Sequence, residues 1–300
     1  MPPEMDDDNA APEAEAPSPA QGGAGLVIVA TPIGNMADIS ARALAALSGA
    51  TYVLCEDTRT TRKLLTRHGI AAKLVAFDDF ADEAQRDRHI AAMQQGARLA
   101  LVSDAGTPLL SDPGYRLVQA AIAAGLPVSV VPGPAASIAG LVLSGLPPSP
   151  HLFLGFLPPK PGAAKKVLET VVAAEAAGLA ATLIFYEAPH RLADTLALLA
   201  EKFPGRQAAV ARELTKLFEE VRRGTLEELA AHYAAQAPRG EIVLLVGPAP
   251  ELAPDALGLE ERLEAAMAHM NMRDAVDAVT AATGMPRRAV YTAALKLKDS

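Results

Sequence analysis

The sequence predicts an α/β protein with two successive sheets and a small helical segment at its end. Three observations support this. In the first half, short apolar runs alternate with helical patterns, which is typical of a mostly parallel sheet covered on both faces. The second half has more strand-like runs and fewer crossovers, which favours a mixed sheet. The last part has helical patterns alone.

The first part runs from about residue 25 to residue 146. Its predicted strands are Leu26–Ala30, Tyr52–Cys55, Leu99–Val102 and Val128–Val131. Its predicted helices are Asp38–Leu47, Thr58–His68, Asp82–Gln94, Pro113–Ala124 and Pro134–Leu143. Gly69, Gly96 and Gly125 follow three of these helices, at the position where glycine commonly ends a helix.

The second part, residues 150–248, follows a proline-rich linker at Gly145–Pro150, because proline disfavours both a helix and a central strand there. Its predicted strands are Leu152–Phe156, Ala181–Tyr186, Gln207–Arg212, Glu219–Arg223 and Glu241–Val246. Its predicted helices are Ala163–Ala177, Pro189–Lys202 and Leu226–Ala234.

The last segment, residues 257–300, follows a second break at Pro248–Pro254. We expect three short helices between Leu259 and Lys298. A short turn with Gly284 and Pro286 separates the last two, as in a helix-turn-helix. A small helical cap explains the same pattern equally well.

The distribution of charge separates an acidic tail from a nearly neutral body. The chain has 300 residues and a formal net charge of −8, but six of its acidic residues lie within the first fifteen positions. This stretch, residues 1–24, is rich in Pro, Ala and Glu and predicts a disordered tail rather than a signal peptide. A local basic patch on the body therefore remains compatible with nucleic acid. Trp is absent and aromatics make up 4%, which argues against an aromatic base-stacking platform.

The cysteine count and the hydropathy pattern bear on the compartment. Cys55 is the one cysteine and cannot form an internal disulfide, so we expect a small core residue in a reduced, intracellular protein. No stretch is long and uncharged enough to span a bilayer, so no membrane partner is expected.

Three loops rich in Gly and Pro follow predicted strands of the first part. They are Thr31–Asn35, Ser103–Gly114 and Pro132–Ser137. Loops at the carboxyl ends of buried strands lie where open α/β sheets bind ligands. Gly admits a ligand to the backbone, and Pro fixes the loop shape. One such loop alone is more often an ordinary strand-to-helix turn, but three in one domain favour a ligand cleft.

The chemistry of these loops suits a polar small molecule. They offer backbone donors, hydroxyls and the carboxylates of Asp104 and Asp112, with no Lys or Arg for a phosphate-rich cofactor. They match neither a phosphate-binding P-loop nor a dinucleotide fingerprint. S-Adenosylmethionine, with an amino-acid end and a nucleoside end, is such a molecule. No metal-binding Cys/His cluster and no Ser/His/Asp nucleophile motif are present, so no metal is expected.

Two further segments carry dense polar groups. Glu56–Lys63 follows the second strand, where Asp57 or Thr58 suits a helix cap and the basic residues suit a phosphate backbone or a solvated face. Tyr186–Arg191 follows a strand in the second part, with Pro189 predicted to open the next helix. The Glu, His and Arg of this segment either face the cleft or form structural ion pairs.

An ordered set of motifs resembles the ribosomal RNA small subunit methyltransferase I family, within the tetrapyrrole methylase superfamily. The motifs are Thr31–Asn35, Glu56–Arg59, Val102–Pro108, Asp112–Tyr115, Tyr186–Arg191, Ala211–Lys216 and Gly240–Leu244. Each motif is modest, but their order from Leu26 to Gly247 is specific, and the terminal helices fit the family's helix-turn-helix.

The resemblance implies a two-domain tetrapyrrole-methylase-like fold with S-adenosylmethionine as methyl donor. It implies 2′-O-methylation of a cytidine ribose in the decoding region of small-subunit (16S) ribosomal RNA, on free RNA or on the assembled 30S subunit, by a cytoplasmic homodimer. By likeness, the donor-binding residues are Pro32, Gly34, Asp104, Ala105, Gly106, Thr107, Pro108, Gly133, Pro134, Ala135, Tyr186, Leu214 and Glu241.

The reaction is expected to be an in-line displacement that relies on positioning. Because a ribose hydroxyl is a weak nucleophile, Glu56, Asp57 and Glu187 are candidate proton acceptors, and Arg59 or Arg191 is a candidate for the adjacent phosphate. Alternatively, the enzyme orients the hydroxyl and solvent takes the proton. Other basic residues that suit RNA are Arg62, Lys63, Arg67, Lys160, Lys165, Lys166, Arg287 and Arg288.

One departure and two rival hypotheses remain. Family members often carry a histidine before an Asn-Glu pair where this chain has Phe77–Glu83, so no role of that histidine carries over. A tetrapyrrole C-methyltransferase is the enzymatic rival, although such enzymes usually have a Gly-x-Gly-x-Gly-Asp loop where this chain has Thr31–Asn35. An RNA-binding adaptor that senses the donor without turnover is the non-enzymatic rival.

Overall fold

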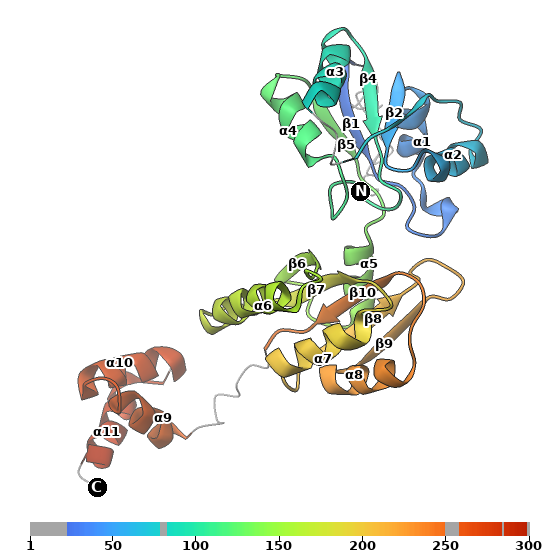
Figure 1. Cartoon of the computed structure of the whole chain (residues 1–300). Coiled ribbons are helices and arrows are strands. Elements are labelled where there is room, and N and C mark those ends of the chain that lie inside the picture. The colour runs from blue at the N-terminus through green and yellow to red at the C-terminus, as the bar shows by residue number, and fades with distance from the viewer. Residues whose placement is uncertain (1–22, 79–82, 250–257, 284, 299–300) are drawn as a thin grey trace, which may run out of the picture. The chain divides into compact units, whose positions relative to one another are not determined.

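The structure is a computed structural model that describes residues 23–78, 83–249, 258–283 and 285–298 (Figure 1). The chain forms two compact units, Met1–Pro248 and Ala249–Ser300. Nearly all of the predicted acidic tail lies outside the described residues, as do parts of the Phe77–Glu83 run and of the Pro248–Pro254 break. The predicted domain boundary between residues 146 and 150 falls within the first unit and stays a prediction.

The first sheet, predicted to be mostly parallel, is parallel throughout. Its strands are β1 (Gly25–Val29), β2 (Tyr52–Cys55), β3 (Leu74–Ala76), β4 (Arg98–Leu101) and β5 (Val128–Val131). They lie in the order β3-β2-β4-β1-β5, and each neighbouring pair is parallel. The three Gly/Pro loops follow β1, β4 and β5, and these three strands are therefore adjacent in the sheet.

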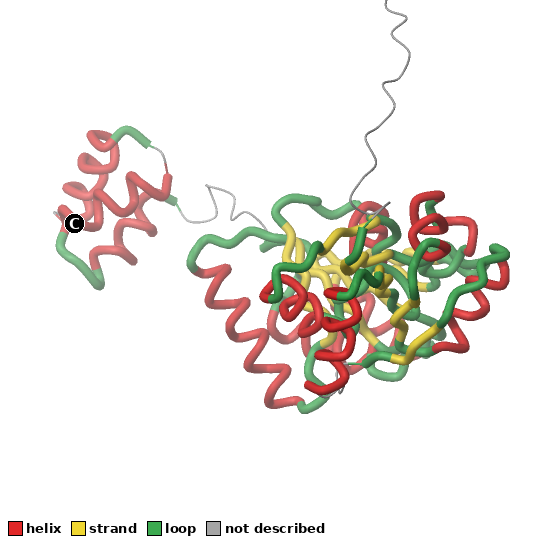
Figure 2. The backbone as a smooth tube through the Cα atoms, turned by 90° about the horizontal axis from the view of Figure 1, so that it is seen from above, coloured by secondary structure: helices red, strands yellow, loops and turns green. Residues whose placement is uncertain are grey.

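Alternation along these strands divides the core into two layers. Val27 and Val29 face α1 (Ala41–Ser48) and α2 (Thr58–Arg67), whereas Leu26 faces α3 (Glu83–Gln94) and α4 (Tyr115–Ala123). Successive side chains of a strand point to opposite faces, so one apolar run supplies both layers. Strands lie inside and helices outside in this unit (Figure 2).

The second sheet is mixed, as predicted. Its strands are β6 (His151–Phe156), β7 (Thr182–Glu187), β8 (Gln207–Arg212), β9 (Glu220–Thr225) and β10 (Ile242–Val246). In the order β6-β7-β10-β8-β9, the first pair is parallel and the others are antiparallel. The helices α6 (Pro161–Ala176), α7 (Leu192–Lys202) and α8 (Leu226–Ala235) cover one face with a shared apolar cluster.

The other face of the second sheet is covered by α5 (Ala136–Ser144), which follows the last strand of the first sheet. Leu141 of α5 packs in one cluster with Ile184, Val243 and Leu245. Gly140 allows this close contact, because a Cβ there would lie 3.0 Å from a methyl group of Val243. One short helix thereby connects the two sheets and brings the loop before it next to the second sheet.

The second unit contains α9 (Leu259–Met267), α10 (Met272–Thr283) and α11 (Arg287–Lys298), as predicted. Leu263, Val276, Val279, Val290 and Ala294 form its buried cluster, with a contribution from each helix. Gly284, which was predicted to lie in the turn before the last helix, lies outside the described residues.

Several helices begin later than predicted. Asp38 ends a short 3-10 helix, Met36–Asp38, and the side chain of Ser40 then caps α1 by accepting a hydrogen bond from the Ala43 amide. The prediction that Pro189 opens the next helix is wrong. The Arg191 amide donates to the Ala188 carbonyl in a turn, so α7 begins at Leu192. Caps and turns determine where these helices begin, and the periodicity of apolar residues does not reveal those positions.

Among the described residues, no helix has the length and apolar character needed to cross a membrane.

Candidate functional site

The three Gly/Pro loops of the first part meet at the carboxyl end of the first sheet. Thr31 and Gly106 exchange two backbone hydrogen bonds of 2.9 and 3.1 Å, which join the loops after β1 and β4. The hydroxyl of Thr107 donates to the carbonyl of Pro134 over 3.0 Å and so joins the loops after β4 and β5. The predicted convergence of the loops on one place is therefore present in the structure.

Two glycines allow close approach of the backbone around this junction. A Cβ on Gly133 would lie 2.9 Å from the Cβ of Ala30, and a Cβ on Gly34 would lie 2.7 Å from the hydroxyl oxygen of Thr215. That hydroxyl accepts a hydrogen bond of 3.0 Å from the Asn35 amide. The first loop thereby contacts the segment after β8, so the loops and the second sheet face one another.

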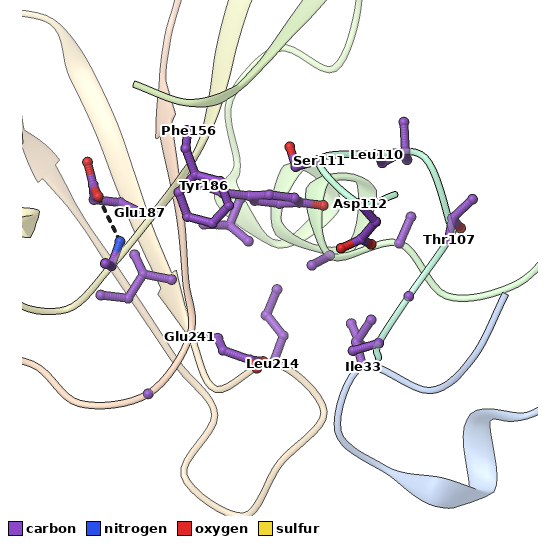
Figure 3. A pocket seen from close by; sticks show the side chains of 18 of the residues that line it. Ile33, Thr107, Leu110, Ser111, Asp112, Phe156, Tyr186, Glu187, Leu214 and Glu241 are labelled. Carbon is purple, nitrogen blue, oxygen red and sulfur yellow. Dashed lines mark hydrogen bonds between the residues drawn. The ribbon is translucent and has the colours of Figure 1, made fainter. Parts of the chain in front are cut away.

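A cavity of about 380 Å³ lies between the loops and the second sheet (Figure 3). Its first wall consists of Ile33, Ala105, Gly106, Thr107, Leu110, Ser111, Asp112, Ala135 and Ala136. Its second wall consists of Phe156, Tyr186, Glu187, Ala188, Pro189, Leu214, Gly240, Glu241, Ile242 and Val243. Apolar walls with a few polar groups and this volume are typical of small-molecule sites.

The structure places about half of the predicted donor-binding residues in the lining. These are Ala105, Gly106, Thr107, Ala135, Tyr186, Leu214 and Glu241. The others lie behind or beside it: Gly34, Gly133 and Pro134 make the loop contacts described above, and Pro108 follows Thr107 along the loop. Pro32 and Asp104 line a separate cavity of about 40 Å³ with Ser103.

The donor-binding residues taken from the resemblance omit several lining residues, and Asp112, whose carboxylate the loop chemistry offered to a ligand, is the most consequential of them. The carboxylate belongs to a loop that the sequence analysis identified, and it points into the cavity (Figure 3). Burial raises the pKa of Asp112 to about 6, the Ser103 hydroxyl opposes this shift, and Glu56 and Asp104 add to it. The loop sequence shows that a carboxylate is present at this position, but it does not show how far that carboxylate is buried.

Apolar residues such as Phe156 and Val243 were missed for a different reason. They continue ordinary strands, and no local signal distinguishes a strand residue at a cavity from one in the core.

The candidates after β2 form a cap and an ion pair. Asp57 caps α2 by accepting from the Arg59 amide over 2.7 Å, and it also pairs with the Arg59 guanidinium at 2.8 Å. These bonds to Arg59 hold the pKa of Asp57 at about 2. The side chain of Arg59 is 87% exposed. Asp57 also donates its amide to Asp104 over 3.1 Å, which connects this segment to the loop after β4. Glu56 precedes Asp57, and its negative charge contributes to raising the pKa of Asp112.

The candidates after β7 form a buried network. Glu187 is 3% exposed, accepts hydrogen bonds from the Ala188 amide (2.7 Å) and the Thr195 hydroxyl (2.6 Å), and lies 3.5 Å from Arg191. Arg191 also donates to the Leu157 carbonyl. In Figure 3 the carboxylate of Glu187 turns toward the Ala188 amide and away from the other labelled side chains. The structural ion pair, one of the two alternatives for this segment, is thus formed.

A second charged network lies at the edge of the second wall. Lys216 pairs with both Glu213 and Glu241, each at 2.9 Å. The Glu241 side chain remains 73% exposed. Glu213 and Thr215 have left-handed backbones, with φ of 51° and 64°, so this segment is a tight turn that presents Leu214 to the cavity.

In the part of the chain that the structure describes, no group of three or more His, Cys, Asp and Glu residues is arranged to hold a metal ion.

Two family models match the chain. One, described as Tetrapyrrole (Corrin/Porphyrin) Methylases, matches residues 25–230. The other, described as RsmI C-terminal HTH domain, matches residues 253–298.

Curated relatives and a solved structure agree with these matches. The chain is 48% identical to "Ribosomal RNA small subunit methyltransferase I" of Mesorhizobium japonicum, over 92% of each chain. It is 51% identical to the protein of that name from Erythrobacter litoralis, over 91% of this chain and 95% of the relative. Its fold is similar to that of uroporphyrin-III-C-methyltransferase from Thermus thermophilus, with a TM-score of 0.52 at 23% identity over 75% of this chain and 94% of that one.

Proposed function

Because the chain belongs to the ribosomal RNA small subunit methyltransferase I family, we propose that it methylates the 2′-oxygen of a cytidine ribose in the decoding region of small-subunit ribosomal RNA. The observation that carries this proposal is the similarity over almost the whole chain, helical segment included. S-Adenosylmethionine supplies an activated methyl group on a positively charged sulfur. Membership of this family supports methylation of ribosomal RNA with S-adenosylmethionine as donor. The cytidine and its 2′-oxygen are what we propose beyond that.

The cavity fits the donor that this function requires. Its volume of about 380 Å³ lies in the range of small-molecule sites. Apolar side chains such as Ile33, Leu214 and Val243 suit an adenine ring, and exposed backbone at Gly106 suits hydroxyl or carboxylate groups. We propose that all thirteen residues named by resemblance act at this site, the lining ones by contact and the others by holding the loops.

Alignment of the ribose hydroxyl with the donor carries most of the proposed rate enhancement. Correct orientation of two reactants lowers a barrier by up to about 7–11 kcal/mol. A carboxylate with a pKa of about 2 is a weak base, so Asp57 is better suited to hold Arg59 than to accept a proton. Glu187 and Arg191 hold the second wall. Glu56 stays the candidate proton acceptor, with solvent as the alternative.

Arg59 is the candidate for a phosphate of the RNA, since its side chain is exposed beside the cleft loops. Arg62, Lys63 and Arg67 extend this basic surface along α2, where they line a shallow depression with Arg59. Arg287 is held by Asp277 at 2.6 Å in the second unit, next to Arg288. We propose that these groups bind ribosomal RNA or the 30S subunit, and that the protein acts as a homodimer in the cytoplasm.

Methyl transfer to defined substrates tests the proposal. Purified protein is incubated with labelled S-adenosylmethionine and either small subunits or free RNA that lack the modification. We expect label in one cytidine ribose, located by nucleotide mapping. Label in a tetrapyrrole precursor, or donor binding without transfer to RNA, would exclude this function.

A further inference from the structure

The lining of the cavity is acidic. Among the described residues that line it, three carry carboxylates, Asp112, Glu187 and Glu241, and none is Lys, Arg or His. Two of the three already bind cations or donors outside the lining, because Glu187 contacts Arg191 and Thr195, and Glu241 contacts Lys216. The charge that the lining offers to a ligand is therefore concentrated at Asp112.

The loop that carries Asp112 is held in one unusual conformation. Leu109 and Ser111 have left-handed backbones, with φ of 77° and 67°. Such conformations are costly for these residues and persist where the surroundings require them. Gly155 on β6 provides room for this loop, because a Cβ there would lie 2.9 Å from the hydroxyl oxygen of Ser111. Gly114 does the same against Leu101, where a Cβ would lie 2.6 Å from a methyl group.

This conformation directs the carboxylate of Asp112 into the cavity, opposite Tyr186 of β7 (Figure 3). The groups around it that titrate or carry charge are acidic or phenolic. Glu56 after β2 and Asp104 after β4 repel its negative charge, and Tyr186, Glu187 and Glu241 lie on the opposite wall. Burial, with this repulsion, raises its pKa to about 6 even though the neighbouring Ser103 hydroxyl favours the ionised form.

A half-buried carboxylate with acidic neighbours is stabilised by a cation. We propose that Asp112 binds a positively charged group of the methyl donor and gives the cavity its preference for a cationic ligand. This inference rests on the proposed function, because the donor in that function carries a sulfonium and an ammonium group. Both attract a carboxylate by their charge, and the ammonium can also donate hydrogen bonds to it.

The charge state of Asp112 then determines how donor binding depends on pH. A cation binds the ionised carboxylate, so the affinity rises as the pH increases through about 6 and is nearly constant above 7. Near pH 6 about half of the Asp112 carboxyls are protonated, and binding of the donor displaces that proton. Each donor bound at pH 6 is therefore expected to release about half a proton.

Calorimetric titration of the full chain with S-adenosylmethionine at pH 5 to 7.5 tests this. Buffers of different ionisation enthalpy report the protons released on binding. Asp112→Asn is expected to weaken donor binding by about ten- to hundredfold at pH 7.5 and to abolish the proton release, because the attraction between the carboxylate and the cation is lost. Asp87→Asn removes one carboxylate from the exposed side of α3 and serves as the matched control, with unchanged affinity.

The product analogue identifies which cation Asp112 contacts. S-Adenosylhomocysteine has the same amino-acid and nucleoside ends but a neutral sulfur. If Asp112→Asn weakens the donor alone, the carboxylate faces the sulfonium. If it weakens both ligands equally, the carboxylate faces the ammonium. Asp112→Glu keeps the charge, so it should retain the proton release even if its affinity differs.

Unchanged donor affinity in a folded Asp112→Asn protein would overturn the inference. So would a loss of methyl transfer with intact binding, because Asp112 would then act on the ribose hydroxyl instead. These results leave the proposed function standing, provided that the wild-type protein binds the donor and methylates RNA. A wild-type protein that binds no S-adenosylmethionine would instead overturn the proposed function itself.

Discussion

The two walls of the cavity are built by different means. The first wall consists of turns whose shape comes from glycine, proline and left-handed residues, and its loops are joined mainly by backbone hydrogen bonds such as those between Thr31 and Gly106. The second wall consists of strand ends held by paired side chains, Glu187 with Arg191 and Glu241 with Lys216. On the second wall the conspicuous charged residues stabilise the fold, whereas on the first wall the charged residue at the cavity is Asp112.

This difference shows how to assign charged residues near a cavity. A carboxylate that already accepts several hydrogen bonds, as Glu187 does, gains little from a ligand and is costly to remove. A carboxylate among acidic neighbours gains more from a cation. The comparison predicts that the largest losses of ligand binding come from changes in the first wall and that the largest loss of stability comes from removing a paired carboxylate of the second wall.

The largest effect is expected from Gly106→Val in the first wall. Gly106 has φ of 77°, and a Cβ there would lie 3.3 Å from a methyl group of Ile33 inside the lining. A β-branched residue is strained there by about 1–3 kcal/mol, and its side chain competes with the ligand for space. We expect donor affinity to fall at least about hundredfold in calorimetric titration.

Gly125→Val is the matched control for that change. Gly125 follows α4 with φ of 67° and has no atom within 4 Å of a built Cβ, so the substitution introduces similar strain without a clash. Its stability should fall while its donor affinity changes less than about twofold. Equal loss of donor binding in both variants would mean that general strain, and not the first wall, is responsible.

Glu187→Ala should produce the largest stability change in the second wall. The substitution removes the acceptor for the Ala188 amide and the Thr195 hydroxyl and leaves Arg191 without its carboxylate. We expect the free energy of unfolding to decrease by about 2–3 kcal/mol, measured by denaturant titration. Donor affinity of the folded protein should stay within about threefold.

Glu187→Gln distinguishes this structural role from the catalytic candidacy of Glu187. The amide keeps the size of the side chain and one acceptor oxygen. A loss of methyl transfer by about hundredfold or more in this variant, with stability close to wild type, would show that the carboxylate takes part in proton transfer.

Asp112→Asn should make the protein more stable at neutral pH. In the folded state the pKa of Asp112 is about 6, above the value of about 3.8 in the unfolded chain, so ionisation of Asp112 disfavours the fold as the pH rises from about 4 to 6. The Asn variant should therefore gain about 1 kcal/mol at pH 7.5, after allowance for the partial exposure of the site, and almost nothing at pH 4. Thermal unfolding at the two pH values measures this, and an equal shift at both would refute it.

The smallest effect is expected from Lys216→Met at the edge of the second wall. The substitution keeps the apolar stem beside Gly34 but removes the cation between Glu213 and Glu241. The cavity becomes more negative, so donor affinity should rise about two- to threefold at low salt and return toward wild type at high salt. Lys202→Met, which removes a cation from α7, is the control. A tenfold loss of affinity would instead indicate that Lys216 contacts the ligand.

Most of the fold could be predicted from the sequence because its signals are local. The bounds of β2, β5 and β8 agree with prediction, and the three helices between residues 259 and 298 were expected. The larger errors are helix starts such as Asp38 and Pro189, where a side-chain cap or a turn outweighs periodicity. The bounds of β1, β4, β7 and β9 also differ slightly from prediction. The position of α5 on the second sheet was not predicted, because its apolar residues would suit either sheet.

The candidate site divides in the same way. Glycine and proline after β1, β4 and β5 identify the first wall, because each of these residues determines the backbone conformation at its own position. The sequence by itself therefore determined the two sheets, the loops of the cavity and the family. Only the tertiary structure decided which carboxylates are committed to partners and which one faces the cavity, because burial and pairing depend on residues that are far apart along the chain.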